Sequence, residues 1–157
     1  MKMSKKNLPK VTKISFETIF KIWSEHLWND RRTPIKPISS MLYLGGYDMS
    51  IYNNDPTFFA IKNNEKIIAV NSGHMTVDNY YRSRGLWVAE EYRNKGLTYL
   101  LFTALFHQAK SEGAKFVWSL PKDNSVGAYI KNGFHIVGNL TNEFELGSHY
   151  YVIRHVD

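Results

Sequence analysis

The sequence predicts a single α/β domain in which helices flank one mixed sheet. Two amphipathic helical patterns are interspersed with short apolar runs that have the length and composition of strands. A strand, a helix and a second strand follow one another across residues 80–120, an order typical of mixed α and β architecture. The 157 residues, 43% of them hydrophobic, suffice for one core and are too few for two ordinary domains.

The first helix is predicted over residues 15–29. Ser15 can cap it, and Asn29 and Asp30 end the pattern. Its apolar positions recur at helical spacing and are Phe16, Ile19, Phe20, Trp23 and Leu27. Residues 34–46 contain two prolines and two glycines, which predict a loop with one or two helical turns.

A meander of strands and the clearest helix follow. Strands are predicted over residues 57–61, 66–77 and 80–89, with turns at 63–65 and 78–79. The helix is predicted over residues 95–112, where an apolar stripe ends at Gly113. The remaining elements are a buried strand at 116–120, a short helix at 124–132 and strands at 134–137 and 150–156.

Composition excludes several kinds of site. The chain has no cysteine, which excludes a disulfide framework, a thiolate zinc site, an iron–sulfur cluster and a cysteine nucleophile. We expect no metal among the site residues. No stretch approaches the roughly 18 apolar residues of a membrane span, and the start of the chain lacks the apolar run of a signal peptide. We therefore expect a cytoplasmic protein without a membrane partner.

The net charge of +6 is concentrated at the N-terminus. Five lysines and no acidic residue lie within residues 1–13, whereas residues 14–157 carry fifteen basic and fourteen acidic residues. We expect residues 1–13 to form a flexible basic arm and residues 14–157 to form the folded domain. Because this domain is nearly neutral, a broad basic face for nucleic acid is not favoured, although a local patch or the arm is compatible with such binding.

The segment most informative about function is the turn that leads into the helix at 95–112. Arg93, Lys95 and Gly96 stand where the helix begins. The first N–H groups of a helix have no partner within it, its dipole is positive there, and a glycine lets a phosphate approach the backbone. The turn is therefore a candidate anion-binding site. The alternative is an ordinary strand-to-helix connection with solvated basic residues.

The run Arg93-x-x-Gly96-x-Thr98 resembles the acyl-CoA signature of the GNAT N-acetyltransferase superfamily, Arg/Gln-x-x-Gly-x-Gly/Ala. The resemblance implies a GNAT-like acyl-CoA N-acyltransferase fold with a central mixed, mostly antiparallel sheet, and acetyl-CoA as co-substrate. The implied acetyl-CoA contacts are Leu86, Trp87, Val88, Arg93, Asn94, Lys95, Gly96, Leu97, Thr98, Asn124 and Ser125. Thr98 stands where the family has glycine or alanine, and the position of the family's asparagine holds Lys122, with Asn124 nearby but out of register.

A second stretch, Ser125-x-x-x-Tyr129-x-x-x-Gly133-Phe134, is similar to the family's helix and β-bend. The resemblance implies that Tyr129 protonates the departing CoA thiolate and that a backbone N–H near Val88 faces the thioester carbonyl; a packed aromatic is the alternative for Tyr129. His74 is the candidate general base because an imidazole titrates near neutrality. The alternative is a packed histidine, with water carrying the proton.

Basic and aromatic residues are candidates for binding the acceptor. Arg82 and Arg84 share one face of their predicted strand and could bind an acidic acceptor; the alternative is a charged sheet edge. Trp28 is the candidate aromatic wall of this site, with core packing as the alternative. It belongs to a group at the end of the first helix that also includes Trp23, His26, Arg31 and Arg32.

The resemblance implies an N-acetyltransferase that moves an acetyl group from acetyl-CoA to a primary amine, and we expect direct attack in a ternary complex. No cysteine, and no serine beside an evident base, is available for an acyl-enzyme. The acceptor would be a small-molecule or macromolecular amine. The alternatives are a non-catalytic module that binds CoA or another anion, and a protein that binds or acetylates nucleic acid. A weaker resemblance of residues 71–74 and 81–85 to small GNAT proteins of tailed phages keeps the last one open. The oligomeric state stays open, with a homodimer among the options.

Overall fold

A seven-stranded sheet forms the centre of the computed structural model, which describes residues 9–144 and 147–157. The strand order is β1-β2-β3-β4-β5-β7-β6, and every neighbouring pair is antiparallel except the parallel pair β4 and β5. The strands are β1 (Val11–Ile14), β2 (Thr57–Asn63), β3 (Lys66–Met75), β4 (Tyr80–Val88), β5 (Phe116–Ser119), β6 (His135–Phe144) and β7 (Gly147–His155). The prediction of a mixed, mostly antiparallel sheet is therefore confirmed.

The N-terminal arm needs a correction, because residues 11–13 are not a flexible tail. They form β1 together with Ile14 and pair antiparallel with β2, where Val11 lies opposite Ile61. Val11 packs into the core on one face of the sheet and Ile14 into the core on the other. Val11 and Ile14 are three positions apart and lie on opposite faces, so the segment lacks the alternation of apolar and polar residues by which a strand is recognised in a sequence. The remainder of the predicted arm, residues 1–8, lies outside the described residues.

The predicted helix at 15–29 is present in two parts. α1 (Phe16–Ile22) begins after Ser15, whose side chain accepts a hydrogen bond from the Thr18 N–H as a cap. It continues as the π-helix η2 (Trp23–Leu27), and the chain then enters the loop predicted for the following residues. A 3₁₀ helix, η3 (Met49–Asn53), follows that loop and was not predicted.

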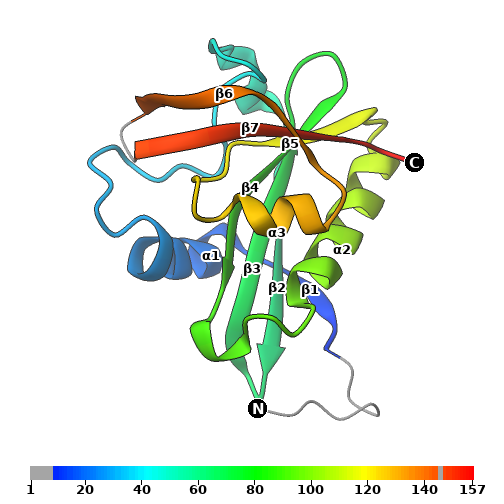
Figure 1. Cartoon of the computed structure of the whole chain (residues 1–157). Helices are drawn as coiled ribbons and strands as arrows, with labels where there is room; N and C mark the ends of the chain where they lie inside the picture. The colour runs from blue at the N-terminus through cyan, green and yellow to red at the C-terminus, as the bar shows by residue number, and fades with distance from the viewer. Residues whose placement is uncertain (1–8, 145–146) are drawn as a thin grey trace.

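Helices cover both faces of the β2–β4 region, as Figure 1 shows. α1 and η2 pack on one face, where Ile19, Trp23 and Val70 belong to one apolar cluster. The long helix α2 (Leu97–Ser111) packs on the other, where its buried side chains meet those of β2 and β3. α3 (Val126–Lys131) lies on the same face as α2. Within the described part of the chain, no helix is long and apolar enough to span a membrane.

The C-terminal hairpin is longer than predicted. β6 covers His135–Phe144 rather than residues 134–137, and β7 covers Gly147–His155 rather than residues 150–156. Two register shifts interrupt the pairing of these strands. Gly138, Asn139, Thr141 and Asn142 interrupt the apolar pattern in the outer part of β6, so apolar alternation stops before the pairing does.

The sheet divides at its centre, between β4 and β5. These two strands pair only where Tyr80 to Arg82 lie beside Phe116 to Trp118, and they diverge beyond this point. The remainder of β4 therefore has β3 as its only strand neighbour among the described residues. The opening leaves one backbone edge of β4 available for other contacts.

A β-bulge interrupts β4 beside this opening. The pairing of β3 with β4 shifts between Val70 and Ser72, so that Gly85 and Leu86 together face Asn71. Gly85 has a φ of +76°, and its carbonyl accepts a 2.9 Å hydrogen bond from the indole of fully buried Trp23. A Cβ at this glycine would lie 2.3 Å from the indole nitrogen. The bulge and the helix η2 therefore fit only with glycine at this position.

We expect Gly85→Ala to destabilise the protein more than Gly138→Ala. The two glycines have nearly equal φ values, +76° and +75°, but a Cβ at Gly138 meets nothing within 4 Å. Both variants acquire the strain of a left-handed residue, about 1–2 kcal/mol. Only Gly85→Ala adds an overlap with Trp23, about 1–3 kcal/mol. Urea denaturation measures both losses, and equal losses would contradict the role of this contact.

Candidate functional site

β4 presents different chemistry on its two faces at the opening. Ser83 points toward α3, whereas Arg82 and Arg84 point toward the loop that follows η2. Side chains alternate along a strand, so three successive residues serve both faces. The candidate site is therefore divided by β4 into a tyrosine side and an arginine side.

On the tyrosine side, Tyr129 of α3 ends in a buried hydrogen-bond network. Its side chain is 3% exposed, and its hydroxyl lies 3.1 Å from Ser119 Oγ and 3.4 Å from Ser83 Oγ. Ser119 Oγ donates its proton to the Ser83 carbonyl at 2.6 Å, and Asn71 donates to Ser83 Oγ at 3.0 Å. Ser119 Oγ is also oriented to donate to the Tyr129 hydroxyl oxygen, and the contact between Ser83 and Tyr129 allows either hydroxyl to donate. Burial raises the pKa of Tyr129, which keeps the phenol protonated at neutral pH.

The basic turn after β4 is open at the start of α2. The turn contains the 3₁₀ helix η4 (Glu90–Tyr92), and both Asn94 and Gly96 have a positive φ, +61° and +80°. Gly96 is the residue that caps α2 and has no side chain with which to satisfy its first N–H groups. A Cβ at Gly96 would meet nothing within 4 Å. The turn thus offers backbone donors at an accessible surface.

The predicted acetyl-CoA contacts do not all lie in this turn. Arg93, Asn94 and Lys95 are exposed there, and Arg93 Nε donates to the Val88 carbonyl at 3.1 Å. Leu97 is in the core, so only its backbone faces the turn. Three half-buried residues precede the turn on β4, namely Leu86, Trp87 and Val88, and Thr98 is half-buried in the first turn of α2.

Asn124 and Ser125 lie in a separate loop, immediately before α3. Both are exposed, and Ser125 Oγ donates to Asn124 Oδ1 at 3.2 Å. The four-residue separation from Ser125 places Tyr129 one turn further along this short helix. These two residues are thus connected to the tyrosine side of the site through α3.

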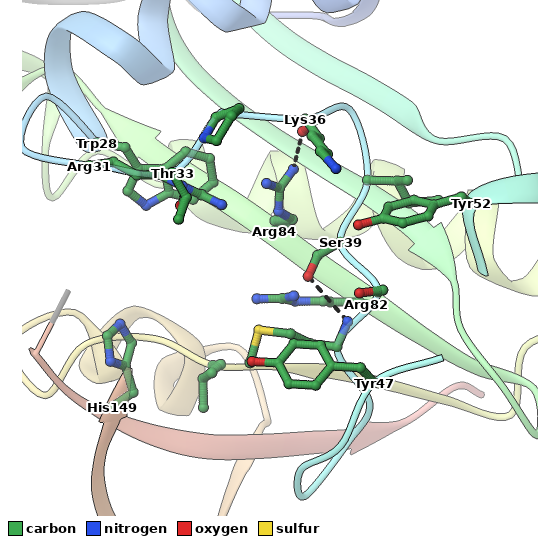
Figure 2. A pocket seen from close by; sticks show the side chains of 15 residues that line it. Trp28, Arg31, Thr33, Lys36, Ser39, Tyr47, Tyr52, Arg82, Arg84 and His149 are labelled. Atoms are coloured by element: carbon green, nitrogen blue, oxygen red, sulfur yellow. Dashed lines mark hydrogen bonds between the residues drawn. The ribbon is translucent and has the colours of Figure 1, made fainter. Parts of the chain in front are cut away.

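On the arginine side, β4 forms the floor of a pocket with a volume of about 500 Å³. The pocket lies under the loop between η2 and η3, and Figure 2 shows the residues that line it. They are Trp28, Arg31, Thr33, Pro34, Lys36, Ile38, Ser39, Ser40, Met41, Tyr47, Tyr52, Arg82, Arg84, Leu120 and His149. The volume is that of a site for a small molecule. The structure thus brings together three predicted acceptor-binding residues, Trp28, Arg82 and Arg84.

Aromatic rings hold the two arginines of the floor. The Arg84 guanidinium lies 5.0 Å from the Trp23 ring and 4.9 Å from the Trp28 ring, and it donates to the Lys36 carbonyl at 2.8 Å. The Arg82 guanidinium lies 5.1 Å from the Trp118 ring. Burial lowers the pKa of Arg82 to about 10 and lowers that of Arg84 well below its ordinary value, and the neighbouring guanidiniums act in the same direction. At neutral pH Arg82 is still protonated.

His74 lies beside these arginines but does not line the pocket. It pairs across the strands with Arg82 and is fully buried. Within the described structure its Nε2 has no hydrogen-bond partner. Burial, followed by the charges of Arg82 and Arg84, lowers the pKa of His74 well below 6.5. The imidazole is therefore neutral at pH 7.

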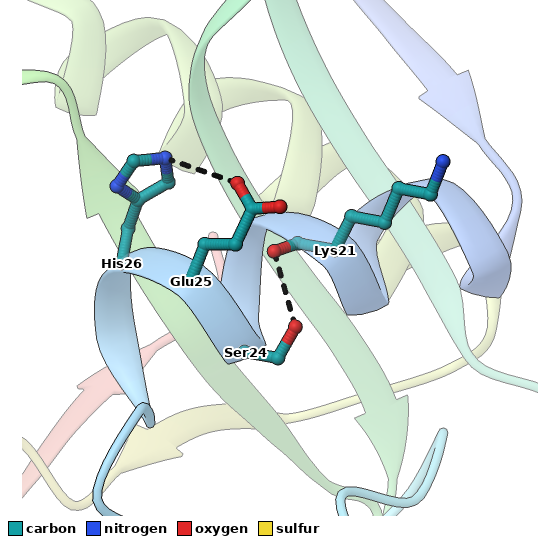
Figure 3. A network of polar contacts seen from close by, with 4 residues as sticks. All are labelled: Lys21, Ser24, Glu25 and His26. Carbon is teal, nitrogen blue, oxygen red and sulfur yellow. Dashed lines mark hydrogen bonds and ion pairs between the residues drawn. The ribbon is translucent and has the colours of Figure 1, made fainter.

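The residues at the end of the first helix separate into two groups. Trp28 and Arg31 enter the pocket, with Arg31 5.1 Å from the Trp28 ring. His26 lies outside it, and its ring stacks on that of Trp87 with 4.7 Å between the ring centroids. The His26 Nε2 lies 3.8 Å from the Glu25 carboxylate (Figure 3). The same figure shows Ser24 bonded to the Lys21 carbonyl, which continues this outer surface.

Sequence analysis missed several residues of the site. Strand alternation could have assigned Ser83 to the face opposite Arg82 and Arg84. Ser119, Asn71 and the pocket residues Lys36 and His149 show no sequence signal, because tertiary folding alone brings them close. Among the described residues, no group of three or more His, Asp or Glu could hold a metal ion.

Comparison with family models matches residues 20–134 to the Acetyltransferase (GNAT) family. No curated protein sequence matches the chain. The IAA acetyltransferase from Bacillus cereus ATCC 14579 is 16% identical, with a TM-score of 0.69 over 94% of this chain and 99% of that one. The ribosomal-protein-S18-alanine N-acetyltransferase from Escherichia coli is 13% identical, with a TM-score of 0.63 over 95% of this chain and 94% of that one. The PaiA N-acetyltransferase from Thermoplasma acidophilum in complex with coenzyme A is 21% identical, with a TM-score of 0.53 over 68% of this chain and 64% of that one. At these low sequence identities, the structural similarity shows a shared fold.

We expect the free energy of unfolding to fall as the pH is lowered from about 7 toward 5. The pKa of His74 is below 6.5 in the folded protein, so under about pH 6.5 the unfolded chain binds a proton that the folded chain does not. The slope contributed by one such group is at most about 1.4 kcal/mol per pH unit.

Urea denaturation of the wild type and of His74→Gln at two pH values measures this slope. The variant is expected to show a shallower dependence. His149, whose pKa is also lowered, accounts for part of the remainder. Identical slopes in the two proteins would contradict this assignment.

Proposed function

The chain belongs to the GNAT acetyltransferase family, whose model spans more than two thirds of it, and on that premise we propose that it transfers an acetyl group from acetyl-CoA to a primary amine. One observation carries the proposal. An open helix N-terminus with basic neighbours and a buried, protonated tyrosine lie on the same face of the divided sheet, with an acceptor-sized pocket on the other face.

We assign the diphosphate of acetyl-CoA to the turn at residues 93–98. The open space at Gly96 and the first N–H groups of α2, which no capping side chain satisfies, fit an anion, and Arg93 and Lys95 add positive charge. Asn94 and Thr98 complete this turn, and the Leu97 N–H contributes from the backbone. Thr98 offers a hydroxyl where the family has a smaller residue. The Thermoplasma acidophilum structure in complex with coenzyme A shares the fold and supports this ligand class.

The rest of the acetyl-CoA molecule would follow the open edge of β4. Leu86, Trp87 and Val88 form this edge, and Asn124 and Ser125 are assigned to the opposite side of the opening, at the start of α3. The Ala89 N–H bonds to β3, so the Val88 carbonyl of the same peptide unit points to the open side. The N–H and carbonyl of one strand residue point the same way. The Val88 N–H is therefore available to a carbonyl oxygen there.

Acetyl-CoA would supply an acetyl group that is already activated as a thioester, so the protein mainly positions the reactants. The Val88 N–H would stabilise negative charge on the carbonyl oxygen. Tyr129 would donate its proton to the leaving sulfur, because its raised pKa keeps the hydroxyl protonated. The described chain offers no cysteine to form an acyl-enzyme, so the amine would attack the thioester directly.

The acceptor amine must lose a proton before it attacks. In our proposal this proton passes to water rather than to His74, the residue first considered for the role. His74 does not line the pocket, and burial, followed by the charges of Arg82 and Arg84, lowers its pKa. The acceptor site would be formed by Trp28, Arg82 and Arg84 on the arginine side of β4.

We expect Gly96→Ala to weaken acetyl-CoA binding by about tenfold or more, because its Cβ would occupy the space assigned to the diphosphate. Gly113→Ala is the matched control, since Gly113 also has a positive φ and open surroundings but lies at the far end of α2. Isothermal titration calorimetry measures both. If the two variants bound acetyl-CoA equally well, the assignment of the turn would be wrong.

We expect Tyr129→Phe to lower kcat by about 10²-fold and to leave the Kd for acetyl-CoA unchanged. The hydroxyl would act only when the thiolate leaves, so its removal affects turnover rather than binding. Thiol release in the presence of a panel of primary amines measures kcat, and circular dichroism checks folding. Acetyl-CoA binding by the wild type without turnover of any amine would favour the non-catalytic binding module instead.

A further inference from the structure

The floor of the pocket holds a buried positive charge that lacks a counter-charge. Arg82 is 8% exposed, and neither its Nε nor its Nη1 has a hydrogen-bond acceptor among the described residues. Neither Arg82 nor Arg84 takes part in an ion pair within the described structure. A buried guanidinium without an anion or acceptor is unfavourable. An anion bound in the pocket would offset this charge.

Several basic side chains share the pocket with Arg82. They are Arg31, Lys36 and Arg84, and none of the described residues that line the pocket is an aspartate or a glutamate. His74 lies behind Arg82 on the neighbouring strand and is neutral at pH 7. Two tyrosines, Tyr47 and Tyr52, also line the pocket. A cationic amine without a compensating anion would be repelled from such a pocket.

The arginines are held in position before any ligand binds. The Arg84 guanidinium lies against two neighbouring tryptophan rings and donates to the Lys36 carbonyl, and Arg82 lies against Trp118. Fixed guanidiniums lose little side-chain entropy on binding. Arg82 lines the pocket, and carboxylate and phosphate are the groups that a guanidinium recognises best.

We propose that the acceptor is a small primary amine that also carries a carboxylate or a phosphate, and that Arg82 binds this anionic group while Arg84 and Arg31 add to the positive field. The inference rests on the acetyl transfer proposed above. Arg82 lies three to four residues from the bulge of β4, roughly 10 Å along the strand. An anion bound at Arg82 and the thioester carbonyl assigned to Val88 would thus lie along the same strand.

Binding of simple anions tests the site independently of catalysis. Inorganic phosphate and succinate are titrated calorimetrically into the wild type, Arg82→Met, Arg82→Lys and Arg154→Met. Arg154 is a suitable control because it also lies over an aromatic ring, Phe106 at 4.2 Å, and bonds to a backbone carbonyl, but does not line the pocket. We expect Arg82→Met to weaken binding of at least one anion by tenfold or more, Arg82→Lys to weaken it less, and Arg154→Met to leave it unchanged.

Paired amines test the acceptor class and separate the two anionic groups. Phosphoethanolamine is compared with ethanolamine, and β-alanine with its amide. We expect kcat/KM to be at least tenfold higher for the charged member of one pair, and we expect Arg82→Met to remove this preference while Arg154→Met retains it. A preference in the first pair identifies phosphate, and one in the second pair identifies carboxylate.

The outcomes distinguish this inference from the proposed function. Acetylation of neutral and anionic amines with equal kcat/KM, or anion binding unaffected by Arg82→Met, would overturn the anionic acceptor and leave acetyl transfer intact. Arg82-dependent anion binding without turnover of any amine would support the anion site and count against acetyl transfer. Acetyl-CoA binding measured with Gly96→Ala reports on the other half of the site.

Discussion

The indole of Trp23 lies directly against Gly85, and the geometry of the site depends on this contact. The indole N–H bonds to the Gly85 carbonyl, and no side chain larger than hydrogen fits at that position. The contact connects the first helical segment to the bulge of β4. On one side of the bulge Arg82 and Arg84 face the pocket, and on the other Leu86 to Val88 form the open edge of the strand. One close approach thus sets the orientation of both halves of the site.

β4 can serve two ligands because it leaves its parallel partner early. Pairing with β5 ends at Arg82. Beyond this point, Tyr129 and its serine partners lie on one face of β4, and the pocket lies on the other. Strand alternation then separates a neutral hydrogen-bonding network from a cationic floor over a few residues. The proposed thioester and acceptor would meet across this strand.

Aromatic rings make the cationic floor tolerable without an internal anion. Trp23 and Trp28 both contact Arg84, and Trp118 contacts Arg82, so each guanidinium exchanges hydration for contact with aromatic rings. The lowered pKa values of both arginines record the desolvation that remains. This arrangement keeps two guanidiniums close together in a small volume, where an anion from outside would interact with both.

Local patterns in the sequence determined the mixed sheet, most helices, the cap at Ser15, the basic turn and the shared face of Arg82 and Arg84, because each depends on neighbours a few residues apart. The tertiary structure decided what depends on distant segments. It paired residues 11–14 with β2, placed Ser83 and Ser119 around Tyr129, buried His74 behind two arginines, and enclosed the pocket with the loop before η3. Contacts between segments dozens of residues apart follow from the packing of the whole chain, so they leave no periodicity or spacing in the sequence from which they could be inferred.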